Sequence, residues 1–328
     1  MIIAGDIGGT KTNVALFEPR EGGLDEPVVY DSYPSNGYDS LESILEHFIS
    51  AHRPRLTHAC FGVAGPVQDG FVATSNLAWD VRAQSLKDVL RLPRVKLIND
   101  LEAAAYGVGC LRPSQIYTLH EGRDGLEGHR ALIAAGTGLG MAGLFWDGRR
   151  HLPIPSEGGH IDFAPRGERE IELLRHMKSK IGGRVSYERV LSGPGLFDIY
   201  EFLRSQKFAE EEAWLAEEIR GGDPSAAVSK AALEGGSGLA AEALDTFVSI
   251  YGGMAGDLVM LLKPSGGLYV GGGIAPKILE KLKDGTFLRS YLDKGRMSFI
   301  VESTPVRVIL DDKTALYGAA FCALLDEV

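Results

Sequence analysis

Residues 1–17, MIIAGDIGGTKTNVALF, predict two strands, Ile2 to Gly5 and Thr12 to Phe17, joined by a tight turn at Gly8 and Gly9. Glycines in such a turn allow backbone N–H groups to point at an oxyanion, and the nearby Asp6 carboxylate can hold a hydrated divalent cation. Glycine pairs between apolar runs also form plain hairpin turns that bind nothing. Taken alone, this stretch leaves both interpretations open.

A second copy of the design favours the ligand-binding interpretation. Residues 131–145, ALIAAGTGLGMAGLF, again place a glycine-rich turn, with Thr137 and Gly138, between two apolar runs. Two further stretches also match: VKLINDLEAAAYG at 95–107 and VRVILDDKTALYG at 306–318, with Asp100 and Asp311 at equivalent positions. The repeats predict two α/β domains of related topology, each opening with a turn of a size that suits a phosphate.

Composition limits the classes of protein. The chain of 328 residues is long enough for two domains, and its content of 45% hydrophobic and 24% charged residues is typical of a globular protein. The formal net charge of −10 offers no basic field for nucleic acid or an anionic membrane surface. The N-terminus lacks the pattern of a secretory leader, and the sequence argues against a membrane span. Three scattered cysteines, Cys60, Cys110 and Cys322, have no zinc-binding spacing and predict reduced thiols in a cytoplasmic protein.

Several polar side chains stand at predicted strand ends or in glycine-rich loops. Asn99 and Asp100 follow the strand 95–98, where α/β proteins bind ligands, although both residue types also cap helices. Glu157 and His160 flank two glycines in PSEGGHIDFAP, and Glu188 precedes a predicted Gly-Pro-Gly turn. A lone Glu or His is often only a salt-bridge partner or a hydrogen-bonded loop residue.

Other expectations concern the frame of the molecule. Leu41 to His52 has helical spacing, residues 111–130 are polar and predict a crossing between domains, and Leu239 to Leu262 predict a long core helix interrupted at Gly252-Gly253. LYVGGGI, residues 268–274, predicts a buried strand that ends in three glycines, with Pro276 opening the next helix. Glycines at that position allow a nucleotide base and sugar to approach the backbone.

With these pieces in place, the sequence resembles the superfamily of sugar kinases, actin and heat-shock-chaperone ATPases. GDIGGTKTNVAL and GTGLG resemble its two phosphate loops, and VGGGIAPK its adenosine segment. INDLEAAAYG, EGGHIDFAP and YERVLSGPG, in that order, closely resemble bacterial glucokinases of the hexokinase type. The resemblance implies a two-domain actin-like ATPase (ribonuclease-H-like) α/β fold with internal duplication and an interdomain cleft. The expected small domain is 1–110 plus 312–328, and the large one is 111–311.

The resemblance also implies an activity and a site. The activity is ATP-dependent transfer of the γ-phosphoryl group of Mg-ATP to the 6-hydroxyl of glucose, which feeds glycolysis, by a cytoplasmic homodimer. Asp100 is the implied catalytic base, and Asp6 positions Mg²⁺ through water. The implied sugar ligands are Asn99, Asp100, Glu157, His160 and Glu188; the phosphates lie on Gly8, Gly9, Thr10, Thr137 and Gly138, and the adenosine on Gly271, Gly272 and Gly273.

The sequence departs from one neighbouring group. ROK sugar kinases carry a cysteine-rich zinc motif after their Glu-x-Gly-His segment, whereas residues 161–190 contain no cysteine, so no zinc is expected. Two alternatives stay open. One is a kinase of another hexose or of an amino sugar, and the other is a nucleotide-switched binding protein that uses the same loops without a sugar.

Overall fold

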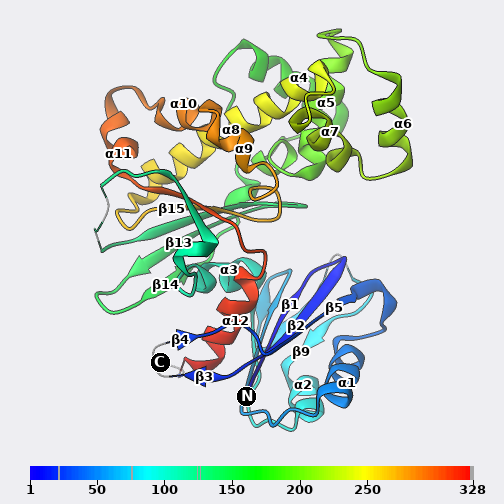
Figure 1. Cartoon of the computed structure of the whole chain (residues 1–328), viewed down its shortest axis with the longest axis vertical. Coiled ribbons are helices and arrows are strands. Elements are labelled where there is room, and N and C mark those ends of the chain that lie inside the picture. The colour runs from blue at the N-terminus through cyan, green and yellow to red at the C-terminus, as the bar shows by residue number, and fades with distance from the viewer. Residues whose placement is uncertain (21–22, 75–76, 124, 126, 326–328) are drawn as a thin grey trace. The chain divides into compact units, whose positions relative to one another are not determined.

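The computed structural model describes residues 1–20, 23–74, 77–123, 125 and 127–325 as a mixed α/β protein (Figure 1). By its contacts the chain divides into two compact units. The first contains Met1–Pro113, His151–Pro155 and Asp311–Val328, and the second contains Ser114–Arg150 and Ser156–Leu310. Each unit is built on its own sheet.

The first unit contains a five-stranded sheet of order β10-β6-β1-β2-β5. The predicted N-terminal hairpin is confirmed: β1 pairs antiparallel with β2, and on its other side β1 pairs parallel with β6. The strands are β1 Ile2–Ile7, β2 Lys11–Phe17, β5 Val29–Pro34, β6 His58–Val63 and β10 Lys96–Asn99.

Alternation along β1 places a core on each face of this sheet. Ile3 and Ile7 belong to a buried cluster that includes side chains of α1 (Leu41–His52) and α2 (Ala83–Leu90). Ile2 and Ala4 belong to a different cluster, which includes side chains of α3 (Asp100–Val108) and α12 (Thr314–Leu324). Since successive side chains of a strand point to opposite faces, the sheet is covered on both sides.

The helices α3 and α12 pack closely against each other. A Cβ atom added at Gly107 of α3 would lie 2.0 Å from the backbone oxygen of Thr314 at the start of α12. Only glycine therefore fits at this crossing. The unit also contains the short strands β3 Pro19–Arg20, β4 Gly23–Leu24, β7 Val67–Gln68, β8 Phe71–Val72, β9 Val81–Arg82 and β14 His151–Ile154 and the 3₁₀ turn η1 Ser35–Gly37.

The sheet of the second unit has the consecutive neighbours β11-β16-β15-β12-β13. The strands are β11 Ile116–His120, β12 Arg130–Ala135, β13 Leu139–Trp146, β15 Leu268–Gly271 and β16 Val306–Ile309. The predicted second hairpin is confirmed as β12 and β13. Residues 111–130, expected only as a polar crossing, contain the strand β11, which pairs antiparallel with β16. Its few apolar residues are Ile116, Tyr117 and Leu119, too few to stand out in a polar stretch.

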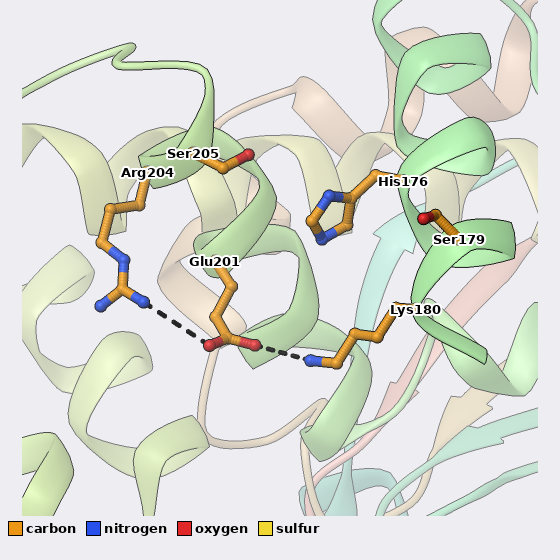
Figure 2. A pocket seen from close by; sticks show the side chains of 6 residues that line it. All are labelled: His176, Ser179, Lys180, Glu201, Arg204 and Ser205. Atoms are coloured by element: carbon orange, nitrogen blue, oxygen red, sulfur yellow. Dashed lines mark hydrogen bonds and ion pairs between the residues drawn. The ribbon is translucent and has the colours of Figure 1, made fainter.

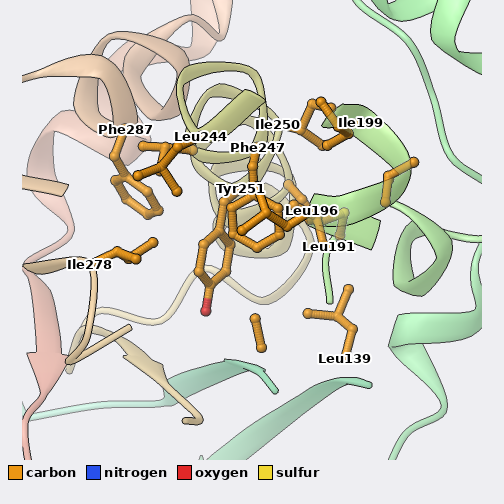
Figure 3. Close-up of a cluster of buried hydrophobic side chains, with 14 of the residues drawn as sticks. Leu139, Leu191, Leu196, Ile199, Leu244, Phe247, Ile250, Tyr251, Ile278 and Phe287 are labelled. Carbon is orange, nitrogen blue, oxygen red and sulfur yellow. The ribbon is translucent and has the colours of Figure 1, made fainter. Parts of the chain in front are cut away.

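A large buried cluster joins this sheet to its helices (Figure 3). Tyr251 lies between the rings of Phe247 and Phe287, and its hydroxyl donates to the backbone oxygens of Ile133 and Gly271 at 3.3 and 3.4 Å. The hydroxyl thus connects the longest helix to two strands. The helices are α4 Glu168–Ile181, α5 Gly193–Ser205, α6 Ala213–Gly221, α7 Pro224–Leu233, α8 Gly238–Leu262, α9 Leu279–Lys283, α10 Thr286–Leu292 and α11 Ser298–Ser303, with 3₁₀ turns at η2 Pro113–Gln115, η3 Gly158–His160, η4 Tyr187–Arg189 and η5 Gly295–Met297.

The prediction that α8 is interrupted at Gly252-Gly253 is wrong, because the helix is continuous over its 25 residues. Gly252 serves helix packing instead: a Cβ there would lie 2.1 Å from the backbone oxygen of Phe287 on α10. By length and hydropathy α8 could cross a membrane, but 72% of its most apolar 18-residue stretch is buried inside the protein. That burial is typical of a core helix.

Two further boundaries differ from the sequence expectations. Gly193-Pro194-Gly195 does not form a separate turn but begins α5, with Ser192 as its N-cap. Proline suits the first turn of a helix because the backbone donor that it lacks has no partner there. After β15 the chain makes turns over 272–278, and α9 begins at Leu279 rather than at Pro276.

Candidate functional site

The glycine turn of the first unit is held by a serine from another segment. The Gly8 N–H donates to the Lys11 oxygen at 3.0 Å and closes the turn. The Ser35 hydroxyl donates to the Gly8 oxygen at 2.7 Å, and the Ser35 N–H donates to the Thr10 oxygen at 3.0 Å. The carbonyl oxygens of Gly8, Thr10 and Lys11 are therefore engaged, and these contacts fix the shape of the turn. Sequence reasoning missed Ser35, and no local pattern marks it.

Carboxylates gather beside this turn. Asp6 of β1 pairs with Gly62 of β6, and Asn99 of β10 pairs with the next residue, Val63, so that the strand ends lie side by side. Burial, together with the charges of Asp100 and Asp312, raises the pKa of Asp6 to about 6, while a hydrogen bond from Asn13 opposes the shift.

Sequence reasoning does not identify Asp312 as a site residue, because the repeat points to its neighbour Asp311. The Oδ1 atom of Asp311 accepts the Lys313 N–H at 2.8 Å. The electrostatic effect on Asp6 indicates that the second residue of this acidic pair lies in the neighbourhood of the predicted metal ligand.

The capping interpretation of Asn99 is confirmed. Asn99 is the N-cap of α3: its Oδ1 accepts the Leu101 N–H at 2.9 Å, and its Nδ2 donates to the Gly65 oxygen at 3.0 Å. The Oδ1 of Asp100 accepts the same N–H at 2.9 Å. The helix N-terminus thus fixes the directions of both side chains, and a cap of this kind still has lone pairs for a ligand.

In the second unit, three of the predicted sugar ligands come together. Nε2 of His160 lies 3.9 Å from Oε2 of Glu157, and Nδ1 of His160 lies 4.0 Å from Oε1 of Glu188. Their side chains are 54%, 80% and 30% exposed in the order His160, Glu157, Glu188, so that the cluster faces solvent. Two carboxylates and an imidazole can accept and donate hydrogen bonds to the hydroxyl groups of a sugar.

This cluster adjoins the second glycine turn. The turn is closed by the Gly136 N–H, which donates to the Gly138 oxygen at 2.8 Å, and Oε2 of Glu188 accepts the Leu139 N–H at 3.1 Å. Gly159, between Glu157 and His160, approaches β13 so closely that a Cβ there would lie 1.9 Å from the Leu139 oxygen. The Glu-Gly-Gly-His motif is therefore packed directly on the strand that leaves the turn.

The triple-glycine segment lies beside the start of the second glycine turn. The Ile274 N–H donates to the oxygen of Ala135, the last residue of β12, at 3.1 Å. Gly271 is buried, whereas Gly272 and Gly273 are exposed. The ends of two strands thus carry the predicted nucleotide residues of this unit: Thr137 and Gly138 follow β12, and Gly271 to Gly273 stand at the end of β15. Thr137 is exposed as well.

The predicted residues form two sets, one in each unit. Asp6, Gly8, Gly9, Thr10, Asn99 and Asp100 belong to the first unit, and Thr137, Gly138, Glu157, His160, Glu188, Gly271, Gly272 and Gly273 belong to the second. Over the described residues, no group of three or more His, Cys, Asp or Glu side chains could enclose a metal ion. A single carboxylate, Asp6, suits a magnesium ion that keeps most of its water and binds phosphate oxygens.

A surface pocket of about 420 Å³ in the second unit contains none of the predicted residues (Figure 2). It is lined by His176, Ser179, Lys180, Glu201, Arg204 and Ser205. Glu201 lies between the two cations, 2.6 Å from Lys180 and 3.6 Å from Arg204. Each of these cations also pairs with a second carboxylate, Asp198 or Glu211.

Comparison with known proteins gives a consistent result. The family model described as Glucokinase matches residues 3–325. A glucokinase of Trichormus variabilis is 40% identical over 98% of each chain. A crystal structure of a glucokinase from an Antarctic psychrotroph is 29% identical, with a TM-score of 0.83 over 98% of each chain.

A glucokinase of Balamuthia mandrillaris, solved in complex with glucose, shares the fold at 22% identity, with a TM-score of 0.82 over 98% of this chain and 93% of that one. The fold is thus that of sugar kinases of the actin-like ATPase type. Because the family model matches residues 3–325 and a relative is 40% identical over 98% of each chain, the chain belongs to the glucokinase family.

Proposed function

We propose that the protein phosphorylates glucose at its 6-hydroxyl with ATP as the donor, and so releases glucose 6-phosphate and ADP to glycolysis. The observation that carries this proposal is the cluster of Glu157, His160 and Glu188 beside the second glycine turn. A protein that only switches with its bound nucleotide has no need of two carboxylates and an imidazole at a phosphate loop. A sugar kinase needs both features next to each other.

The roles follow from the chemistry of each group. Asn99, Asp100, Glu157, His160 and Glu188 hydrogen-bond the sugar hydroxyls, and a sugar that leaves one of them unpaired loses about 1–3 kcal/mol of binding. Asp100 accepts the proton of the attacking hydroxyl. Gly8, Gly9, Thr10, Thr137 and Gly138 line the phosphates, and Gly271 to Gly273 lie against the adenosine.

Asp6 would hold a hydrated Mg²⁺ ion, and the ion would neutralise charge on the phosphate oxygens. Phosphoryl transfer asks little covalent chemistry of the protein, and the work of these residues is to position the two substrates and exclude water. We expect the protein to bind no zinc, because residues 161–190 contain no cysteine.

The domain organisation is part of the proposal. We infer two duplicated α/β domains, 1–110 plus 312–328 and 111–311, each of which carries part of the predicted site. The two compact units of the structure support this division, because their limits lie within a few residues of the proposed domain limits. The exception is 151–155, which belongs to the first unit. Cytoplasmic location and a homodimer are further expectations of the family.

The test is ADP production by the purified protein with Mg-ATP and a panel of glucose, mannose, fructose, N-acetylglucosamine and N-acetylmannosamine. We expect glucose to give the highest kcat/KM. Activity on another sugar alone would contradict the substrate assignment. ATP binding without sugar-dependent ADP release would contradict the kinase assignment and favour a nucleotide-switched binding protein.

A further inference from the structure

One carboxylate of the second unit makes contacts on two sides. Oε1 of Glu188 faces Nδ1 of His160 at 4.0 Å, on the side of the proposed sugar ligands. Oε2 accepts the N–H of Leu139 at 3.1 Å, in the residue that follows the second glycine turn. A hydrogen bond to an ionised acceptor is stronger than one between neutral groups, so that this contact holds the end of the turn firmly.

The rest of the segment that carries Glu188 holds the other end of the turn. The Gly193 N–H donates to the Gly136 oxygen at 2.8 Å. The Ser192 hydroxyl donates to the Glu188 oxygen at 2.7 Å, and the Gly193 oxygen in turn accepts the Ser225 hydroxyl at 2.6 Å. Residues 188–193 therefore brace the turn at both Gly136 and Leu139.

Gly138 shows how little space separates the turn from the carboxylate. A Cβ atom at this position would lie 2.6 Å from Oε2 of Glu188 and 3.4 Å from its Cδ. Any side chain larger than hydrogen would displace the Glu188 carboxylate. Glycine at position 138 therefore leaves room for the Glu188 carboxylate, whether or not a phosphate also approaches the turn here.

We propose that Glu188 is a positioning residue for the second phosphate loop as well as a sugar ligand, so that sugar binding and the order of this loop are coupled through its carboxylate. The inference rests on the proposed function for the sugar. A sugar hydroxyl bound at Oε1 restrains the Glu188 side chain in the conformation in which Oε2 holds the Leu139 N–H. The loop is then ordered before the phosphates arrive.

The first test measures the loop without any ligand. Amide hydrogen exchange at Leu139 should be at least about tenfold faster in Glu188→Ala than in the wild type, because the N–H loses its acceptor. Glu217→Ala, at an exposed glutamate of α6, is the matched control and should leave this exchange unchanged. Equal protection of Leu139 in Glu188→Ala and wild type would overturn the proposal whatever the substrate.

The second test is a double-mutant cycle on glucose binding to the nucleotide-free protein, measured by calorimetry. Gly138→Ala should weaken glucose binding about tenfold or more although Gly138 is not a proposed sugar ligand, and it should add little to the loss already caused by Glu188→Ala. Additive losses would contradict the coupling. A wild-type protein that binds no glucose would overturn the proposed function itself, a result distinct from additivity.

The second test needs folded variants, and circular dichroism checks that. Should Gly138→Ala fail to fold, glucose itself supplies the measurement. Saturating glucose should slow Leu139 exchange in the wild type but not in Glu188→Ala at concentrations that saturate the variant. Equal slowing in both proteins would overturn the proposal.

Discussion

A Cβ atom at Gly318 of α12 would lie only 1.7 Å from the backbone oxygen of Ala103 on α3. The reverse contact, between Gly107 of α3 and the oxygen of Thr314 on α12, is nearly as close at 2.0 Å. The same sequence offset that relates Ala103 to Thr314 relates Gly107 to Gly318. Gly318 thus contacts Ala103, and its equivalent Gly107 contacts Thr314, the equivalent of Ala103. The crossing is therefore symmetric with respect to the two repeated stretches.

Gly318→Ala should destabilise the protein by about 1–3 kcal/mol, since the added methyl group must push the two helix backbones apart. The measurement is the free energy of unfolding from a urea titration. Gly238→Ala is the matched control: Gly238 also lies in a helix, but a Cβ there meets nothing within 4 Å. It should be neutral or slightly stabilising, because alanine favours helix more than glycine does. Equal effects of the two substitutions would contradict the packing argument.

Asp100→Asn should lower kcat by about 10²- to 10⁴-fold while the protein stays folded, because the amide cannot accept the proton of the sugar hydroxyl. The amide oxygen can still accept the Leu101 N–H, so that the helix cap survives. Steady-state kinetics with Mg-ATP and glucose measure the effect, and Asp88→Asn, at an exposed position of α2, serves as the control. Retention of more than about a tenth of wild-type kcat would refute the role of base.

Asp6 makes stability depend on pH in an unusual direction. Its folded pKa of about 6 lies above the ordinary value of 3.8, so the folded state binds this proton more tightly, and the contribution of Asp6 to stability falls as pH rises from about 4 to 6. At pH 7 without metal, Asp6→Asn should raise the free energy of unfolding by on the order of 1–3 kcal/mol.

Near pH 4 the gain from Asp6→Asn should shrink, and urea titrations with EDTA at both pH values measure it. Adding Mg-ATP should stabilise the wild type more than the variant, and the variant should lose activity. A variant that is less stable than the wild type at pH 7 would show that the Asp6 carboxylate is not destabilising there.

Two substitutions at Asn99 separate its cap from its proposed contact with the sugar. Asn99→Ser keeps a cap oxygen but removes the donor to the Gly65 oxygen, whereas Asn99→Ala removes both and should lower stability by about 1 kcal/mol more than serine does. Both should raise the KM for glucose with little change in the KM for ATP. An unchanged glucose KM in both variants would leave Asn99 a structural cap only.

The sequence predicted those parts of the molecule that depend on local patterns. The two glycine hairpins, the helix 41–52 and the Asn99-Asp100 corner follow from alternation, helical spacing and strand ends, and all are present. The contacts that shape the candidate site are between distant segments. Ser35 on the Gly8 turn and Gly193 on Gly136 have no signal in their own neighbourhood, because nothing local says which loop they will meet.

Local pattern and structure differ at several glycines. The local pattern predicts a break in α8 at Gly252-Gly253 and a turn at Gly193 with Gly195, since glycine lowers helix propensity by up to about 1 kcal/mol. In both places the tertiary packing decides. α10 needs the space at Gly252, and a Cβ at Gly195 would lie 2.6 Å from the backbone of Val190. Such needs become visible only when the partner backbone is in place.

The burial of α8 has a consequence for how the protein fails. Unfolding of the second unit would release 25 mostly apolar residues in one continuous stretch, which at micromolar concentrations favours aggregation over return to the native state. Heat inactivation of this enzyme should then be irreversible, and its apparent melting temperature should rise with the scan rate. The half-life of the protein at high temperature would then be set by the rate at which α8 leaves the core.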